Sequence, residues 1–276
     1  MSGPQASGPP AAADPGILVR TEGTARIIEI DRPRSRNALT PDMLARLRDA
    51  VAEADAAPGL RLVVLRGRGD GPFSSGYDLG ALPEDRALSP EEVRALLAPI
   101  RRLTDAIAAC RLPVLGVARR YAIGAAFDVF AHCDLRVADD GARFALPAAQ
   151  LGFAYPLEGV ARLQRTLGSG LTERLLLLAE TLPAATLLQT GFLHRTVPAE
   201  GLDGLVEELA GRFNGLAPLA VAGLKQGLRA AEAGGPAFDA AADAFYRTIT
   251  HCMNSEDARE GPAATREKRP PRFTGR

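Results

Sequence analysis

Tryptophan is absent from this chain of 276 residues, and cysteine is scarce. The three cysteines, Cys110, Cys133 and Cys252, are odd in number, lie far apart and form no CxxC pair. This pattern indicates neither a disulfide framework nor a thiolate metal site. Free cysteines of this kind favour a reducing compartment, and we therefore expect the protein in the cytoplasm.

Histidine is equally scarce, and the common catalytic motifs are missing. His132, His194 and His251 are the only histidines, and the sequence contains no Walker loop, no GxSxG elbow and no HExxH motif. The stretch GRGDGP at 67–72 has GxGxG spacing, with a proline where a dinucleotide-binding loop needs a helix to begin. We therefore expect no metal ion, no dinucleotide loop and no Ser-His-Asp chemistry.

Net charge and long apolar runs are also lacking. The 33 basic and 33 acidic residues cancel, so the surface as a whole has no excess charge with which to bind nucleic acid or an anionic membrane. No run of about 18 apolar residues occurs, which predicts no membrane-spanning helix. Residues 1–14 have no basic start and no apolar centre, so we expect a disordered tail there rather than a signal peptide.

Short apolar runs predict strands that alternate with helices. Strands are expected at GILVRT, ARIIEID, RLVVLRG, PVLGVA and DLRVA, and near FLHRTV. Helices are expected over 40–56, which opens with a Thr-Pro pair, and over 89–110, which opens with Ser-Pro-Glu-Glu. From about Glu200 onward only helical spacing remains. We predict an α/β core over 15–199 and a helical segment over 200–276.

Several stretches of the sequence carry a family signature. They are DRPRSRNALTPDML, FSSGYDL, the segment PVLGVARRYAIGAAFDVFAHCDLRVADDGARFALPAAQLGFAYPLEG, and SEDAREG followed by EKRPPRF. Together they resemble the enoyl-CoA hydratase/isomerase family, the crotonases, from about Leu18 to Arg276. The resemblance implies an α/β fold, a crotonase-type spiral of ββα turns, with a helical C-terminal segment that builds a homotrimer or homohexamer. It also implies an acyl-CoA substrate, carried as a coenzyme A thioester, and no permanently bound cofactor.

The stretch GPFSSGYDLGAL, residues 71–82, follows a predicted buried strand and is rich in small residues. By resemblance, its Tyr77 N–H and the Ala125 N–H form an oxyanion hole for the enolate oxygen of the thioester. A glycine precedes each donor, Gly76 and Gly124, and lets the backbone turn without a Cβ beside the thioester. The alternative reading is a pair of ordinary strand-to-helix turns.

The acid and base groups depart from the family pattern. A typical hydratase carries two glutamates, at the positions that Asp128 and Ala148 occupy in this chain. Asp128 lies three residues after Ala125, on the same helix face, so its shorter carboxylate can still point toward the thioester. Its alternative role is to complement the helix dipole. Because Ala148 cannot titrate, the resemblance does not extend to water addition by two carboxylates.

Two further side chains are candidates for proton chemistry. Tyr155 and Glu158 lie in LGFAYPLEG, which lines the acyl pocket in this family, and Tyr155 coincides with a tyrosine of the methylmalonyl-CoA decarboxylase branch. Otherwise Tyr155 is an aromatic of the pocket wall and Glu158 a solvent-facing residue at a helix start. By resemblance, CoA contacts are expected at Arg36, Gly76, Tyr77 and Lys268. In the family, the lysine often reaches the CoA of a neighbouring subunit.

These residues leave more than one function open. The leading hypothesis is a lyase or isomerase that stabilises the enolate of a CoA thioester. A decarboxylase of malonyl-type acyl-CoA is the runner-up, favoured by Tyr155. A non-catalytic acyl-CoA-binding protein is the rival from another class, favoured by Ala148 and the short side chain of Asp128. Turnover on a panel of acyl-CoA thioesters distinguishes the binding protein from the enzymes.

Overall fold

A computed structural model describes residues 16–83, 86–231 and 235–276, so the tail expected over 1–14 lies outside the described residues. The chain forms a large sheet in which every strand pairs with the sheet's next strand along the chain. In order, these strands are β1 (Gly16–Glu22), β2 (Ala25–Asp31), β3 (Leu62–Gly67), β4 (Val114–Ala118), β6 (Leu135–Asp139) and β9 (Arg195–Val197). The β1 and β2 strands are antiparallel, and the later pairs are parallel. The predicted strands are confirmed.

Helices connect and cover these strands. The helices are α1 (Pro41–Ala56), α2 (Pro90–Ala109), α3 (Ala125–His132), α4 (Leu157–Leu177), α5 (Ala184–Gln189), α6 (Leu202–Asn214), α7 (Pro218–Ala231), α8 (Gly235–Met253) and α9 (Glu256–Glu267). Short 3₁₀ turns occur at Pro33–Ser35, Leu79–Ala81, Ala149–Leu151 and Ala199–Gly201. The two predicted helix starts are confirmed, because Thr40 caps α1, and Ser89 with Glu92 forms a capping box on α2.

A second, small sheet contains β5 (Tyr121–Ile123), β7 (Arg143–Ala145) and β8 (Leu182–Pro183). The chain order β4, β5, α3 is repeated as β6, β7, α4. In each repeat, a long strand joins the large sheet and a short strand joins the small one. This is the strand-strand-helix turn that the family resemblance implied.

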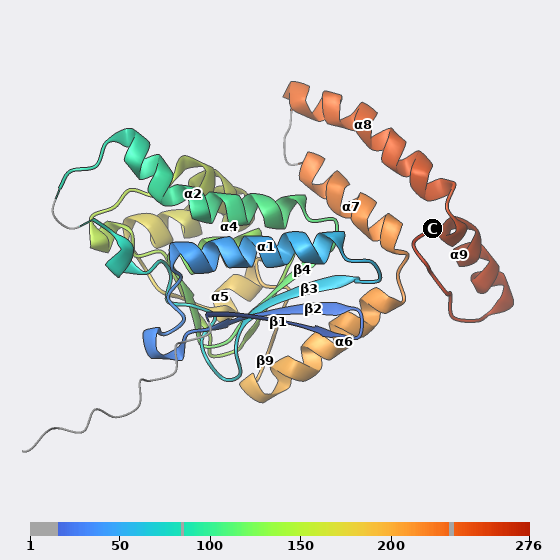
Figure 1. Ribbon diagram of the computed structural model, residues 1–276, viewed down its shortest axis with the longest axis horizontal. Helices are drawn as coiled ribbons and strands as arrows, with labels where there is room; N and C mark the ends of the chain where they lie inside the picture. Colours follow the sequence, from blue (N-terminus) through green and yellow to red (C-terminus); the bar gives the residue numbers. More distant parts are fainter. Residues whose placement is uncertain (1–15, 84–85, 232–234) are drawn as a thin grey trace, which may run out of the picture.

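Two apolar layers lie on the two faces of the large sheet. Along β2, Ile28 and Ile30 belong to the core cluster that contains residues of α1, α2 and α3, whereas Ile27 packs in a second cluster with Leu202 and Leu205 of α6. Successive strand residues point to opposite faces, which explains the division. Figure 1 shows α1 and α2 on one face and α6 on the other.

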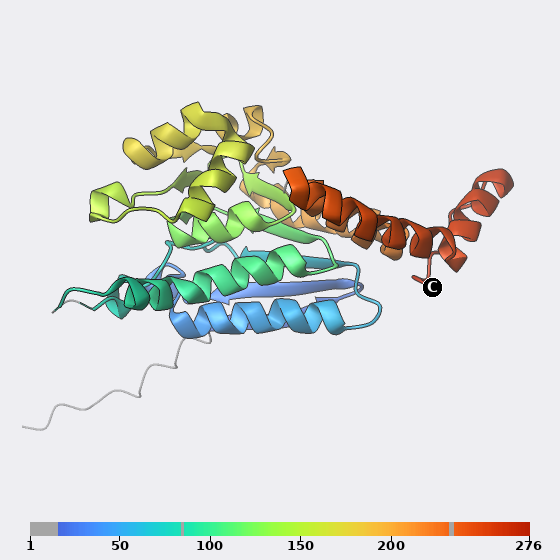
Figure 2. The ribbon, with the colours of Figure 1, turned by 90° about the horizontal axis from the view of Figure 1, so that it is seen from above.

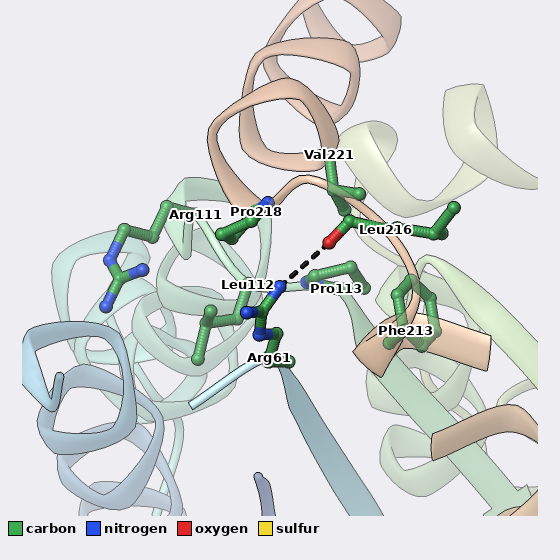
Figure 3. Close-up of a pocket in the computed structure, with 8 residues that line it drawn as sticks. All are labelled: Arg61, Arg111, Leu112, Pro113, Phe213, Leu216, Pro218 and Val221. Atoms are coloured by element: carbon green, nitrogen blue, oxygen red, sulfur yellow. Dashed lines mark hydrogen bonds between the residues drawn. The ribbon is translucent and has the colours of Figure 1, made fainter. Parts of the chain in front are cut away.

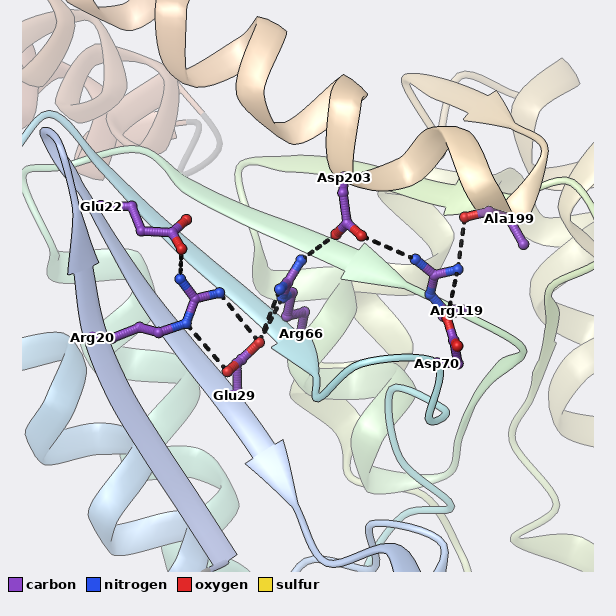
Figure 4. A network of polar contacts seen from close by, with 8 residues as sticks. All are labelled: Arg20, Glu22, Glu29, Arg66, Asp70, Arg119, Ala199 and Asp203. Carbon is purple, nitrogen blue, oxygen red and sulfur yellow. Dashed lines mark hydrogen bonds and ion pairs between the residues drawn. The ribbon is translucent and has the colours of Figure 1, made fainter.

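A ladder of ion pairs lies beside the apolar cluster between α6 and the large sheet (Figure 4). Arg66 of β3 is 2.9 Å from Glu29 of β2 and 2.6 Å from Asp203 of α6. Arg119 is 3.7 Å from Asp203 and also pairs with Asp70 at 3.4 Å. The ladder therefore ties α6 to the sheet through charges in addition to apolar packing.

The helices α8 and α9 extend away from the sheet to one side in both views (Figures 1 and 2). The preceding helix, α7, is anchored to the core by two cations. Lys225, which is buried, and Arg229 each bond to one carboxylate oxygen of Asp134, at 2.7 and 2.9 Å. Within the described residues, none of the helices is both long and apolar enough to cross a membrane.

Candidate active site

Two loops meet beyond the carboxyl ends of the central strands. The loop after β3 runs alongside β5, because Ser74 bridges to Ala122 and its carbonyl accepts the Ile123 N–H at 3.1 Å. On its other side, Tyr77 bridges to Leu39. The segment that leads to Tyr77 is thereby held against the strand that leads to α3.

The closest approach of the two loops occurs at Gly76. Its φ angle is +104°, which L side chains rarely adopt, and a Cβ there would lie 2.6 Å from the carbonyl oxygen of Ile123 and 3.5 Å from the backbone nitrogen of Ala125. Gly124, with φ 58° and ψ −128°, makes the second tight turn and precedes the first residue of α3. Both predicted glycine positions therefore carry the geometry for which the backbone requires glycine.

Two backbone amides remain unused at this approach. Three neighbouring N–H groups have acceptors: Gly76 donates to Ser74 Oγ at 3.0 Å, Asp78 to Leu39 O at 2.9 Å and Gly124 to Ala145 O at 2.8 Å. In contrast, the Tyr77 and Ala125 N–H groups donate to no acceptor among the residues that the structure describes. Unpaired amides at the start of a helix are suited to bind an oxygen that carries negative charge.

Asp128 lies one turn into α3, and its side chain is only 15% exposed. Its Oδ1 atom is buried without a hydrogen-bond partner. Burial raises the pKa of this carboxyl group, while the Tyr155 hydroxyl and the charge of Arg162 oppose the rise. A carboxyl group with a raised pKa in an apolar setting is suited to exchange a proton with a bound ligand.

Tyr155 precedes α4, and its ring packs against the large core cluster. Its hydroxyl is buried and unpartnered. Burial, and then the adjacent Asp128 carboxylate, raise the Tyr155 pKa well above 10, so the phenol is neutral and can donate a proton in a hydrogen bond. The two groups influence each other electrostatically without a hydrogen bond of normal geometry between them.

Unsatisfied buried polar atoms concentrate at these residues. Only four side-chain nitrogen or oxygen atoms of the described residues are buried without a partner, and those of Tyr77, Asp128 and Tyr155 are three of them. The fourth is Nε of Arg26. Because a buried orphan polar atom costs about 1–3 kcal/mol, such a concentration indicates a site that a ligand completes.

The remaining predicted residues lie farther from this arrangement or are more exposed. Glu158 is exposed in the first turn of α4, and Ala148 is half-buried beside the turn at Ala149–Leu151. Arg36 is exposed, and its carbonyl accepts the Ser75 N–H at 3.1 Å, which places it next to the loop of Tyr77. Lys268 caps the C-terminal end of α9, and α9 extends away from the large sheet (Figures 1 and 2).

Sequence reasoning missed two charged or polar neighbours of Asp128. His132 lies one helical turn later, with Nδ1 2.7 Å from the Asp128 carbonyl oxygen and 3.7 Å from Oδ1. Arg162 of α4 acts electrostatically on Asp128, His132 and Tyr155. The i,i+4 spacing from Asp128 to His132 was a signal that could have found the histidine.

A small pocket lies at the amino ends of β3 and β4 and is separate from these residues (Figure 3). Its lining includes Arg61 and Pro113, which immediately precede β3 and β4, whereas Tyr77 and Ala125 follow the carboxyl ends of those strands. The Arg61 guanidinium donates to the carbonyls of Leu216 and Phe273 at 2.8 and 2.6 Å. These bonds hold the loop between α6 and α7 and the C-terminal tail. No group of His, Cys, Asp and Glu side chains able to hold a metal occurs within the described ranges.

Comparison with known proteins identifies the architecture. A model of the enoyl-CoA hydratase/isomerase family matches residues 20–276. The chain belongs to this family. It is therefore an acyl-CoA-processing enzyme, and its fold is the crotonase fold that its structural neighbours share.

Individual crotonases align over almost their whole length. A crotonyl-CoA hydratase of Syntrophomonas wolfei is 30% identical over 261 residues, which are 93% of this chain and 97% of the relative. A carnitinyl-CoA dehydratase of Proteus mirabilis is 32% identical over 265 residues, covering 94% and 98%. The solved enoyl-CoA hydratase of Mycobacterium smegmatis superposes with a TM-score of 0.84 at 28% identity, covering 94% of this chain and 99% of that one.

Proposed function

We propose that this crotonase stabilises the enolate of an acyl-CoA thioester with the N–H groups of Tyr77 and Ala125. The observation that carries the proposal is the pair of unused amides at the closest approach of two loops, one turn away from a buried carboxyl group. Two preorganised donors beside a developing oxyanion are worth several kcal/mol of barrier in comparable sites, about 2.7–4 kcal/mol for each donor removed.

Asp128 is the acid/base group of the proposed reaction. In hydration, the oxygen of water adds to the β-carbon of an enoyl thioester, electrons move to the thioester oxygen, and one proton of the water passes to the α-carbon. A single carboxylate can accept that proton and then return it to the α-carbon, so the step balances without a second carboxylate at Ala148. The relatives named crotonyl-CoA hydratase and carnitinyl-CoA dehydratase support water addition or removal as the reaction.

Tyr155 and Glu158 are assigned unequal roles. The buried, neutral Tyr155 hydroxyl orients the group that gives a proton to Asp128 or receives one from it. Glu158 is the alternative acid/base group, although its exposure in the single chain favours Asp128. The same hydroxyl supports a second candidate function, decarboxylation of a malonyl-type thioester, in which it would hold the departing carboxylate.

Coenzyme binding is assigned to Arg36, which adjoins the loop of Tyr77, and to Lys268 of a neighbouring subunit. The family acts on CoA thioesters, and cations are the expected partners of the coenzyme's phosphates. The position of α9 at one end of the molecule supports a role for Lys268 across a subunit interface.

The Asp128→Asn substitution tests the proposal. The amide keeps the shape of the side chain but cannot exchange a proton, so we expect kcat for crotonyl-CoA hydration to fall by about 100-fold or more with little change in KM. Glu158→Gln is the matched control and is expected to retain most activity. Steady-state kinetics on crotonyl-CoA and on a malonyl-type thioester provide the measurement.

The other outcomes are equally informative. Full activity of Asp128→Asn combined with loss in Glu158→Gln would move the acid/base role to Glu158. Turnover of the malonyl-type thioester alone would select the decarboxylase. Binding of every thioester without turnover would leave a binding protein, contrary to the proposal.

A further inference from the structure

The first turn of α4 contains a glycine whose surroundings are filled by one side chain. A Cβ on Gly159 would lie 2.4 Å from Cε1, 2.9 Å from Cζ and 3.0 Å from the hydroxyl oxygen of Tyr155. The three nearest heavy atoms all belong to Tyr155, so the phenol ring occupies the space closest to Gly159. The Gly159 backbone has no positive φ angle, so the ring, rather than the backbone, requires glycine.

The polar end of the ring is the part that lies over the glycine. Ordinary contacts of a Cβ start at 3.4 Å, so an alanine methyl would force the ring back by about 1 Å at Cε1. Misplacement of a catalytic group by about 1 Å can cost roughly 100-fold in rate. The absence of a side chain at Gly159 therefore determines the position of the Tyr155 hydroxyl.

The position of the Tyr155 hydroxyl matters for Asp128 of α3. Its Oδ1 and the Tyr155 hydroxyl are both buried and unpartnered, and each is the other's electrostatic neighbour. His132 and Arg162 are the other charged or titratable groups that act on Asp128 in this region. The neutral phenol supplies a proton that can be shared with substrate, beside the acceptor oxygens of the Asp128 carboxyl group.

We propose that Gly159 is a positioning residue, which seats the Tyr155 ring so that its hydroxyl and the Asp128 carboxyl can hold one substrate atom between them. The proposal rests on the proposed function of Asp128 and Tyr155. It deepens that function by explaining how a chain with alanine at position 148 presents a second polar group to the acyl part of a CoA thioester.

Gly159→Ala tests the proposal, and Gly170→Ala is the matched control. Gly170 lies in the second part of α4, beyond the break in the helix at Gly168 (φ 76°, ψ 164°), and has no atom within 4 Å of an added Cβ. We expect Gly159→Ala to lower kcat on the preferred thioester about as much as Tyr155→Phe does, by at least roughly tenfold, with KM changed less than about twofold. The double variant should lose no more than Tyr155→Phe alone, since Gly159 acts through the hydroxyl.

A spectroscopic readout keeps this test separate from the test of the proposed function. The chain has no tryptophan and four tyrosines, so ultraviolet difference spectra follow tyrosine ionisation, and Tyr155→Phe identifies the contribution of Tyr155. Displacement of the ring should change the ionisation of Tyr155 in Gly159→Ala and leave it unchanged in Gly170→Ala. This result would hold even if Asp128→Asn proved fully active.

Two results would overturn the proposal: wild-type kcat with an unshifted tyrosine titration in Gly159→Ala, or additive losses in the double variant. If Gly159→Ala fails to fold, Tyr155→Leu introduced beside it should restore folding, because the clashing ring is gone. Failure of that rescue would show that Gly159 serves something other than Tyr155.

Discussion

His132 shows how strongly the interior of α3 controls a titratable side chain. Its Nδ1 atom donates to the Asp128 carbonyl oxygen at 2.7 Å. Burial, and then the positive charge of Arg162, lower the His132 pKa to about 3. The imidazole is therefore neutral at pH 7, and it adds no positive charge that would stabilise ionised Asp128.

This depressed pKa predicts acid sensitivity. Between pH 6.5 and about 3 the unfolded chain binds a proton at His132 that the folded chain does not. The contribution of His132 to the free energy of unfolding is therefore complete above pH 6.5 and is lost as the pH falls. The slope is at most about 1.4 kcal/mol per pH unit. Thermal unfolding of the wild type and of His132→Gln between pH 7.5 and 4.5 measures it. We expect the two stability curves to converge toward low pH; parallel curves would contradict the assignment. Asp128 is present in both proteins, so its opposite contribution, from a raised pKa, largely cancels.

At the scale of elements, α7 depends on a cation that the core encloses. Lys225 Nζ donates to the carbonyls of Ile107 and Leu112 at 3.0 and 2.9 Å and pairs with Asp134 at 2.7 Å. Asp134 in turn accepts the Val114 N–H at 2.7 Å. The lysine thus joins α7 to the end of α2 and the start of β4.

Removal of this cation should release α7. We expect Lys225→Met to lower the free energy of unfolding by about 3–5 kcal/mol, because it leaves Asp134 buried with less compensating charge. Chemical denaturation provides the measurement, and Leu224→Met, at the exposed neighbouring position, is the control. A loss below about 1 kcal/mol would mean that Arg229 alone suffices to hold Asp134.

The elements also show what the sequence could and could not predict. The six strands of the large sheet were recognisable from their apolar runs. The family resemblance pointed to Asp128 and Tyr155 as candidates, and to both glycines before the free amides. The small sheet was missed because β5 and β7 have three residues each and β8 two, too short for a periodic signal. The contacts of Gly159 and Lys225 were equally hidden, because each depends on a partner that tertiary structure brings into reach.

At the scale of the molecule, the single chain leaves apolar surface in water on its C-terminal helices. Leu224 and Leu228 of α7 are 65% and 71% exposed, and Tyr246 and Met253 of α8 are 68% and 72% exposed. Large exposed apolar side chains grouped on neighbouring helices mark a contact surface between proteins. The predicted homotrimer, or a hexamer of two such trimers, would cover it.

Sedimentation equilibrium tests this assembly. We expect the mass of a trimer or hexamer at micromolar concentration, and a shift toward monomer in Leu228→Asp, because a charge would be buried in the interface. Val19→Asp, at an exposed position of β1 outside the C-terminal helices, is the control. A wild-type monomer at that concentration would contradict the prediction.

The strand order of the large sheet has a consequence for biosynthesis. Because β1, β2, β3, β4, β6 and β9 are neighbours in the same sequence in which they occur along the chain, each strand can add to an edge that the ribosome has already released. Until β9 emerges, that growing edge is the parallel edge of β6, with unpaired backbone groups open to other nascent chains. The connection from β6, which ends at Asp139, to β9, which begins at Arg195, is the longest between neighbouring strands of this sheet, so this edge stays open for longer during translation than any earlier one.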